Sequence, residues 1–133
     1  MAQEAIQLLP RKLVEGLSQE VFMGNVRVKD AYLEVFRPFG DVQGVVDSAL
    51  QHYAIEKANE KIAALRRKVK VWEDKYGCTY EVFAYRTARD EEYVQELNHN
   101  PQTAMWEGDL IVWEFQAQEL AEWYRRLQDI LMA

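Results

Sequence analysis

Apolar residues recur at alternating steps of three and four residues in two separate parts of the chain. Apolar side chains every 3.5 residues form one stripe along a helix and pack against a partner helix. Each series covers 21 residue steps, which is about 31 Å of helix. The equal lengths predict an antiparallel helical hairpin, closed within one chain or between two chains. The first heptad series is Ile55, Ala58, Ile62, Leu65, Val69, Trp72 and Tyr76. The second heptad series is Leu110, Trp113, Ala117, Leu120, Tyr124, Leu127 and Leu131.

The pattern before the first heptad series is different. Val26 and Val28 alternate with polar residues, which is the period of a short strand over about 22–28. Asp30 is expected to cap a short helix over 30–37. Proline and glycine directly after this helix are expected to end it.

The longest helix is predicted to begin at Asp41 and to reach Tyr76, where Gly77 suits a left-handed helix end. Near Tyr53 the apolar stripe jumps to the first heptad series, so the two parts of this helix are expected to face different partners. We therefore expect an N-terminal module over 1–54 and a helical partner-binding region over 55–133.

A middle helix and a last helix complete the prediction. Thr79 is expected to cap the middle helix, which the segment Asn98 to Pro101 ends. The last helix is predicted from Gly108 or Asp109 to about Leu131. The predicted fold is mainly α: a short strand, a long helix, and a heptad-patterned antiparallel hairpin that includes a middle helix.

Composition and charge narrow the function classes. The chain has 133 residues, of which 49% are hydrophobic, enough for one packed domain. No stretch approaches the roughly 20 apolar residues of a membrane span, and no membrane partner is expected. Cys78 is the only cysteine, which fits a reducing cytoplasm. Residues 77–133 carry four basic and eleven acidic residues, a net charge of −7, which favours either a basic partner or a solvated acidic surface.

The chain offers little catalytic chemistry. No glycine-rich phosphate loop, paired-cysteine metal site or HExxH pattern is present. The E-x-x-H from Glu96 to His99 occurs once, whereas di-iron bundles need two copies on separate helices. His52 precedes Glu56 by one turn, which favours a surface contact. We expect no enzyme activity, no catalytic residue, no metal and no cofactor.

Tryptophan and tyrosine residues are candidates for partner contact. Trp72 and Trp113 occupy heptad positions and are expected in the core. Trp106 and Trp123 fall outside these positions, and large amphipathic aromatics often supply binding energy at interfaces. Packing against the middle helix is the alternative. The candidate partner-binding residues are Tyr80, Phe83, Tyr93, Trp106 and Trp123.

The order of strand, short helix, turn and long helix resembles a ribbon-helix-helix module. In that fold two chains pair their strands into a ribbon that enters the major groove of DNA. The resemblance implies that Val26 and Val28 point into a dimer, and that Asn25, Arg27 and Lys29 point outward to read DNA. Residues 1–40 carry five basic and five acidic residues, however, whereas phosphate contacts normally rest on a basic excess. A dimerising ribbon without DNA binding is the alternative.

Two further segments resemble a family of small prokaryotic antitoxins that are encoded beside a toxin gene. Residues 72–83 read WEDKYGCTYEVF and are similar to a recurring hinge of the form E-x-K-Y-G-x-[ST]-[FY]-E-x-F. Residues 106–115 read WEGDLIVWEF, like the D-x-x-E-W-E segment before the last helix of that family. Cys78 stands where a methionine or another apolar residue is expected. With the ribbon-helix-helix-like front, the resemblance covers about 22–131.

The resemblance implies a protein of two parts. The front dimerises, as a homodimer or a higher oligomer, and is a candidate for binding operator DNA. The acidic helical back binds and neutralises a cognate toxin. The competing hypothesis is a helical homodimerisation or adaptor module without DNA binding. The neutral charge of residues 1–40 favours this second hypothesis.

Overall fold

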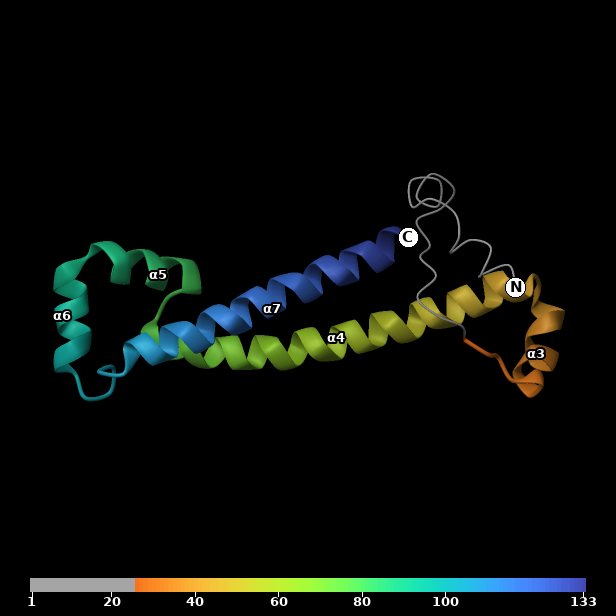
Figure 1. Cartoon of the computed structure of the whole chain (residues 1–133), viewed down its shortest axis with the longest axis horizontal. Coiled ribbons are helices and arrows are strands. Elements are labelled where there is room, and N and C mark those ends of the chain that lie inside the picture. Colours follow the sequence, from red (N-terminus) through yellow and green to blue (C-terminus); the bar gives the residue numbers. More distant parts are fainter. Residues whose placement is uncertain (1–25) are drawn as a thin grey trace, which may run out of the picture. The chain divides into compact units, whose positions relative to one another are not determined.

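The computed structural model describes residues 26–133, and its packing divides the chain into two units, Met1–Val46 and Asp47–Ala133. The helices are α3 (Asp30–Phe36), the 3-10 helix η1 (Arg37–Phe39), α4 (Val42–Tyr76), α5 (Tyr80–Arg89), α6 (Glu91–His99) and α7 (Trp106–Met132) (Figure 1). The described part is therefore mainly helical, as predicted. None of the helices in residues 26–133 is long and apolar enough to cross a membrane.

The described residues of the first unit contain the predicted short helix, as α3, followed by η1. Asp30 is the first residue of α3 rather than its cap. The capping position is held by Lys29, whose carbonyl accepts hydrogen bonds from the amides of Tyr32 (3.0 Å) and Leu33 (3.2 Å). An acidic side chain in the first turn is stabilised by the helix dipole, so Asp30 contributes charge there instead of a cap.

The predicted strand over 22–28 falls mostly outside the described residues. Residues 26–29 are described and have no regular secondary structure. Residues 22–25, including the DNA-contact candidate Asn25, lie outside the description. A ribbon would also need the strand of a second chain, and the structure describes one chain. The strand therefore stays a prediction.

The long helix α4 ends at Tyr76, as predicted, and begins one residue after the predicted start, because Asp41 caps it. One carboxylate oxygen of Asp41 accepts a hydrogen bond from the Gly44 amide at 3.1 Å, and the Asp41 carbonyl accepts one from the Val45 amide at 3.0 Å. At the other end Gly77 has φ +69° and donates its amide to the carbonyl of Glu73 at 2.8 Å. Such a left-handed residue favours glycine, which has no Cβ to clash with the backbone.

Within the second unit, α4 and α7 run side by side in opposite directions (Figure 1). Lys61 of α4 pairs with Glu119 of α7 at 3.4 Å. Further along, the indole N–H of Trp72 donates to the side-chain oxygen of Gln116 at 2.7 Å. As the chain advances along α4, the paired positions move back along α7, so the two helices form an antiparallel hairpin in this chain. The buried members of the two heptad series are Ala58, Ile62, Leu65, Val69, Trp113 and Leu120.

The middle helix is two helices, and its prediction as one was wrong. Asp90 ends α5 with extended backbone angles (φ −105°, ψ 94°), and its carboxylate accepts the Tyr93 amide at 3.1 Å. Aspartate is a preferred N-cap because its side chain satisfies a free amide of the first turn. The carboxylate therefore starts a second helix, α6, at Glu91.

The last helix begins two residues before the earliest predicted start. Trp106 is only 9% exposed, and its indole N–H donates to the side-chain oxygen of Asn98 at 2.8 Å. Its backbone amide also bonds to the carbonyl of Thr103 at 3.0 Å. Burial of Trp106 against α6 thus fixes the first turn of α7.

An aromatic core lies where α5 and α6 cover the hairpin. Phe83 and Trp113 are fully buried, with ring centroids 5.3 Å apart. Tyr76 packs on Phe83 at 4.3 Å, and Trp106 approaches Phe83 edge-on at 6.4 Å. No third layer covers the opposite end of the hairpin within the second unit, and there Leu131 of the second heptad series stays 59% exposed.

Candidate partner-binding surface

The structure places most of the predicted partner-binding aromatics inside the core. Phe83 is fully buried, and Tyr93 and Trp106 are each 9% exposed. Tyr80 and Trp123 are partly buried and pack against the same core. A partner does not reach the first three side chains in this conformation. Their aromatic character reflects the packing of α5 and α6 on the hairpin.

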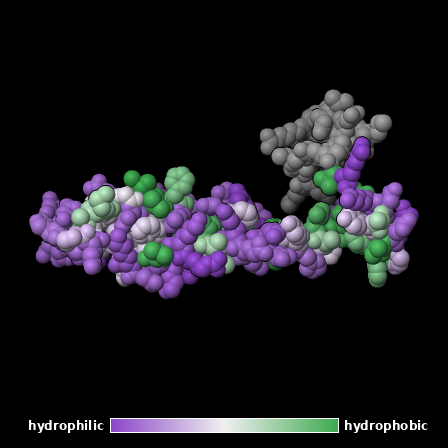
Figure 2. Space-filling model, turned by 90° about the horizontal axis from the view of Figure 1, so that it is seen from below, coloured by the Kyte–Doolittle hydropathy of each residue, from purple (hydrophilic) through white to green (hydrophobic). Residues whose placement is uncertain are grey.

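A different set of apolar side chains faces solvent on α7. Phe115 is 74% exposed, Ile111 62% and Val112 45%. Ile111 and Phe115 are four residues apart and therefore neighbours on one helix face. We call these three residues the outer face of α7. In Figure 2 apolar patches interrupt the mostly hydrophilic surface of the helices.

The surroundings of the outer face are acidic. Helix α7 carries six acidic and two basic residues. Glu107 lies one turn before Ile111, is exposed, and has no ion pair within residues 26–133. Glu119 lies one turn after Phe115 and pairs with Lys61. Exposed apolar groups with a charged rim are typical of protein-binding surfaces.

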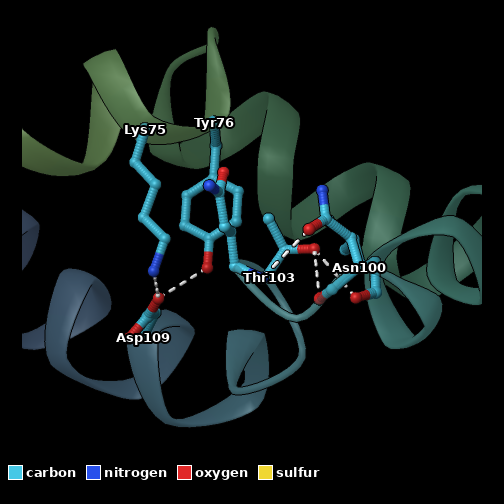
Figure 3. Close-up of polar contacts among 7 residues, drawn as sticks. Lys75, Tyr76, Asn100, Thr103 and Asp109 are labelled. Atoms are coloured by element: carbon cyan, nitrogen blue, oxygen red, sulfur yellow. Dashed lines mark hydrogen bonds and ion pairs between the residues drawn. The ribbon is translucent and has the colours of Figure 1, made fainter.

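The first turns of α7 are held firmly, which makes the outer face a fixed surface. The carboxylate of Asp109 accepts hydrogen bonds from the Lys75 ammonium at 2.7 Å and from the Tyr76 hydroxyl at 2.5 Å (Figure 3). Burial alone would raise the pKa of Asp109, but these two donors outweigh it and lower the pKa from 3.8. Burial and the same carboxylate raise the pKa of Tyr76. The donors thus hold Asp109 charged and tie α7 to the end of α4.

We expect Asp109→Asn to lower the free energy of unfolding by about 1 kcal/mol at pH 7, because it weakens two charge-assisted hydrogen bonds. The pKa of Asp109 is lower in the folded protein than in the unfolded chain. The stabilisation is therefore complete above the unfolded pKa of 3.8 and is lost as the pH falls through the folded value. Urea unfolding from pH 7 to pH 2.5 measures this difference.

The matched control for Asp109 is Asp74→Asn. Asp74 pairs with Lys70 at 3.1 Å, but both side chains are about two-thirds exposed. Exposed pairs of this kind contribute well under about 1 kcal/mol. An Asp109→Asn protein whose stability difference from the parent were the same at pH 7 and pH 2.5 would contradict this role for the carboxylate.

The loop before α7 is also tied down by its own side chains. The hydroxyl of Thr103 donates to the carbonyl of Leu97 at 2.8 Å, and the side-chain oxygen of Asn100 accepts the Gln102 amide at 2.9 Å (Figure 3). Such local bonds replace helical bonds where the chain turns. The start of α7, which carries the outer face, is therefore held both by its bonds to α4 and by the bonds within the preceding loop.

A groove opens on another side of α7, between α4, the start of α5 and α7. Its volume is about 300 Å³. Small side chains on α7, Ala117 and Ala121, leave the space, and Val69 and Leu120 form an apolar floor. The remaining lining residues are polar or aromatic: Arg66, Glu73, Thr79, Tyr80, Glu81 and Tyr124.

The other candidate residues from the sequence are not among the residues of these two surfaces. Arg27 and Lys29 are described and exposed. The His99 ring bonds to the carbonyl of Gln95 at 2.6 Å, a contact within α6. Among residues 26–133 no three His, Cys, Asp or Glu side chains gather as metal ligands would. Burial raises the pKa of the Cys78 thiol, although the nearby Arg86 charge opposes this, and a raised pKa disfavours the nucleophilic thiolate.

Comparison of the chain with models of protein families, with curated proteins and with solved structures gave no match.

Proposed function

We propose that this protein binds and neutralises a basic protein partner, in the manner of an antitoxin that blocks the toxin encoded beside it. The outer face of α7 carries this proposal. A fixed helix that exposes Phe115 and Ile111 next to each other, in a segment with excess negative charge, suits an apolar contact with a basic rim.

The acidic excess supports a basic partner over an acidic one. Residues 77–133 have a net charge of −7, and this region contains α5, α6 and α7. Complementary charge speeds encounter and disfavours partners of the same sign. The outer face would supply most of the affinity, and the surrounding carboxylates would supply selectivity.

The first unit is proposed to dimerise. Among its described residues Tyr32, Val35 and Phe39 are 53%, 59% and 77% exposed, a pattern that fits apolar surface awaiting a second chain. The same observation favours the competing proposal, a homodimeric adaptor that binds neither a toxin nor DNA.

Operator binding by Arg27 and Lys29 is a further part of the antitoxin proposal. A gel shift with the operon's own promoter fragment tests this part separately.

Co-expression with the product of the adjacent gene tests the proposed function. We expect growth arrest when that product is expressed alone, rescue when this protein is present, and a stable complex on co-purification. A neighbouring product that neither binds this protein nor arrests growth would leave the adaptor proposal standing and overturn the antitoxin proposal.

A further inference from the structure

The groove between α4, α5 and α7 has a polarised lining. Glu73, near the end of α4, and Glu81, in the first turn of α5, both line it. Neither carboxylate has an ion-pair partner within residues 26–133. Arg66 lines the groove seven residues before Glu73, which is about 10 Å along the helix. The groove therefore has a negative end beside α5 and a positive charge two turns away.

Tyr80, in the groove wall, lies close to the negative charges at the α5 end. Burial raises the pKa of the Tyr80 hydroxyl, and the charges of Glu114 and Glu81 raise it further. The dipole of α5 places partial positive charge at the same helix start, but it amounts to only about half an elementary charge. A cation is thus favoured at this end of the groove.

The rest of the lining suits a long aliphatic stem. Val69 and Leu120 are only 6% and 7% exposed and form the floor of the groove. The groove is wide above Ala117 and Ala121 because their side chains are small. The volume of about 300 Å³ equals about ten water molecules at roughly 30 Å³ each, enough for one long side chain. Long cationic side chains commonly bury their stems on apolar surface and keep the charge at a polar end.

We propose that this groove receives an arginine side chain of the protein partner, with its stem on Val69 and Leu120 and its guanidinium between Glu73 and Glu81. Arginine fits better than lysine because a guanidinium pairs with carboxylates through two parallel bonds and stacks on aromatic rings. Tyr80 and Tyr124 supply such rings in the groove. This inference rests on the proposed function in taking a basic protein as the partner.

Amide-detected NMR of the full chain with N-acetyl-arginine amide as the probe tests this inference. We expect shifts confined to the amides around Thr79 to Glu81 and Ala117 to Ala121. N-acetyl-citrulline amide has nearly the same shape without the charge, and we expect it to bind at least fivefold more weakly. Equal shifts with both probes, or no shifts with arginine, would overturn the proposal.

Two variants, each with a matched control, localise the site. Ala121→Phe fills the groove from an exposed position and should abolish the shifts, whereas Ala63→Phe, exposed on α4, should leave them unchanged. Glu73→Gln should weaken arginine binding about threefold to fivefold, as expected for one partly exposed ion pair, with Asp74→Asn as the neutral control. Arginine shifts that persist in Ala121→Phe would place the probe elsewhere and overturn the assignment.

The outcomes separate this inference from the proposed function. If the adjacent gene's product binds the parent and the groove variants equally well, the groove assignment fails and the proposed function stands. If arginine binds in the groove but no neighbouring product binds the chain, the proposed function fails and the chemistry of the groove stands.

Discussion

Leu65→Asp is expected to unfold the helical unit Asp47–Ala133. Leu65 is 2% exposed in the middle of the first heptad series. Truncating a buried leucine costs about 2–5 kcal/mol, and burying an unpaired carboxylate adds several more. Because small domains are stable by only about 5–15 kcal/mol, this sum removes most or all of the stability. Circular dichroism during heating should show loss of the cooperative transition.

Ala63→Asp is the matched control for this substitution. Ala63 lies two residues earlier on the same helix and is exposed. The same carboxylate there meets water, so only the lower helix propensity of aspartate counts, about 0.7 kcal/mol. A Leu65→Asp protein that melted like the Ala63→Asp protein would contradict the hairpin core described above.

The second large effect is expected for Trp113→Ala, with a loss of about 3–5 kcal/mol in the free energy of unfolding. Trp113 has no exposed surface and packs on three rings, with centroid distances of 5.3 Å to Phe83, 5.9 Å to Tyr80 and 6.0 Å to Tyr76. Removing the indole therefore leaves a cavity at the point where α4, α5 and α7 meet. Urea unfolding at pH 7 measures the loss.

Trp113→Phe separates ring packing from hydrogen bonding. The indole N–H of Trp113 is buried, and no hydrogen-bond partner for it is found within residues 26–133. Phenylalanine keeps most of the ring contacts and removes the unpaired donor, so we expect a smaller loss, about 1–2 kcal/mol. Equal losses for the alanine and phenylalanine variants would contradict a role based on packing.

Local chemistry made part of the fold predictable. The helix start near Asp41, the cap at Thr79 and the helix end at Gly77 each depend on a few neighbouring residues, and the structure has all three. The heptad spacing likewise predicted the antiparallel hairpin. It left open whether the hairpin closes within one chain, because an apolar stripe specifies a partner helix but not which chain supplies it.

Nonlocal packing explains what the sequence did not predict. Aspartate is preferred as a cap but also occurs inside helices at a modest cost, so the residue type at Asp90 did not by itself predict the break between α5 and α6. The burial of Trp106 depends on Asn98 in another helix. The exposure of Ile111 and Phe115 on α7 was not predicted, because the second heptad series follows a different stripe of the same helix. Their four-residue spacing was the available signal.

The most direct test of the proposed partner surface is the affinity of the chain for the adjacent gene's product, measured by calorimetry. The double variant Ile111→Gln with Phe115→Gln should bind at least tenfold more weakly, because exposed apolar anchors at interfaces each carry about 1–2 kcal/mol or more. Val71→Gln removes an apolar residue that is 59% exposed on α4, and it should bind like the parent. A double variant that bound as tightly as the parent would contradict the assignment of the outer face of α7 as the docking surface.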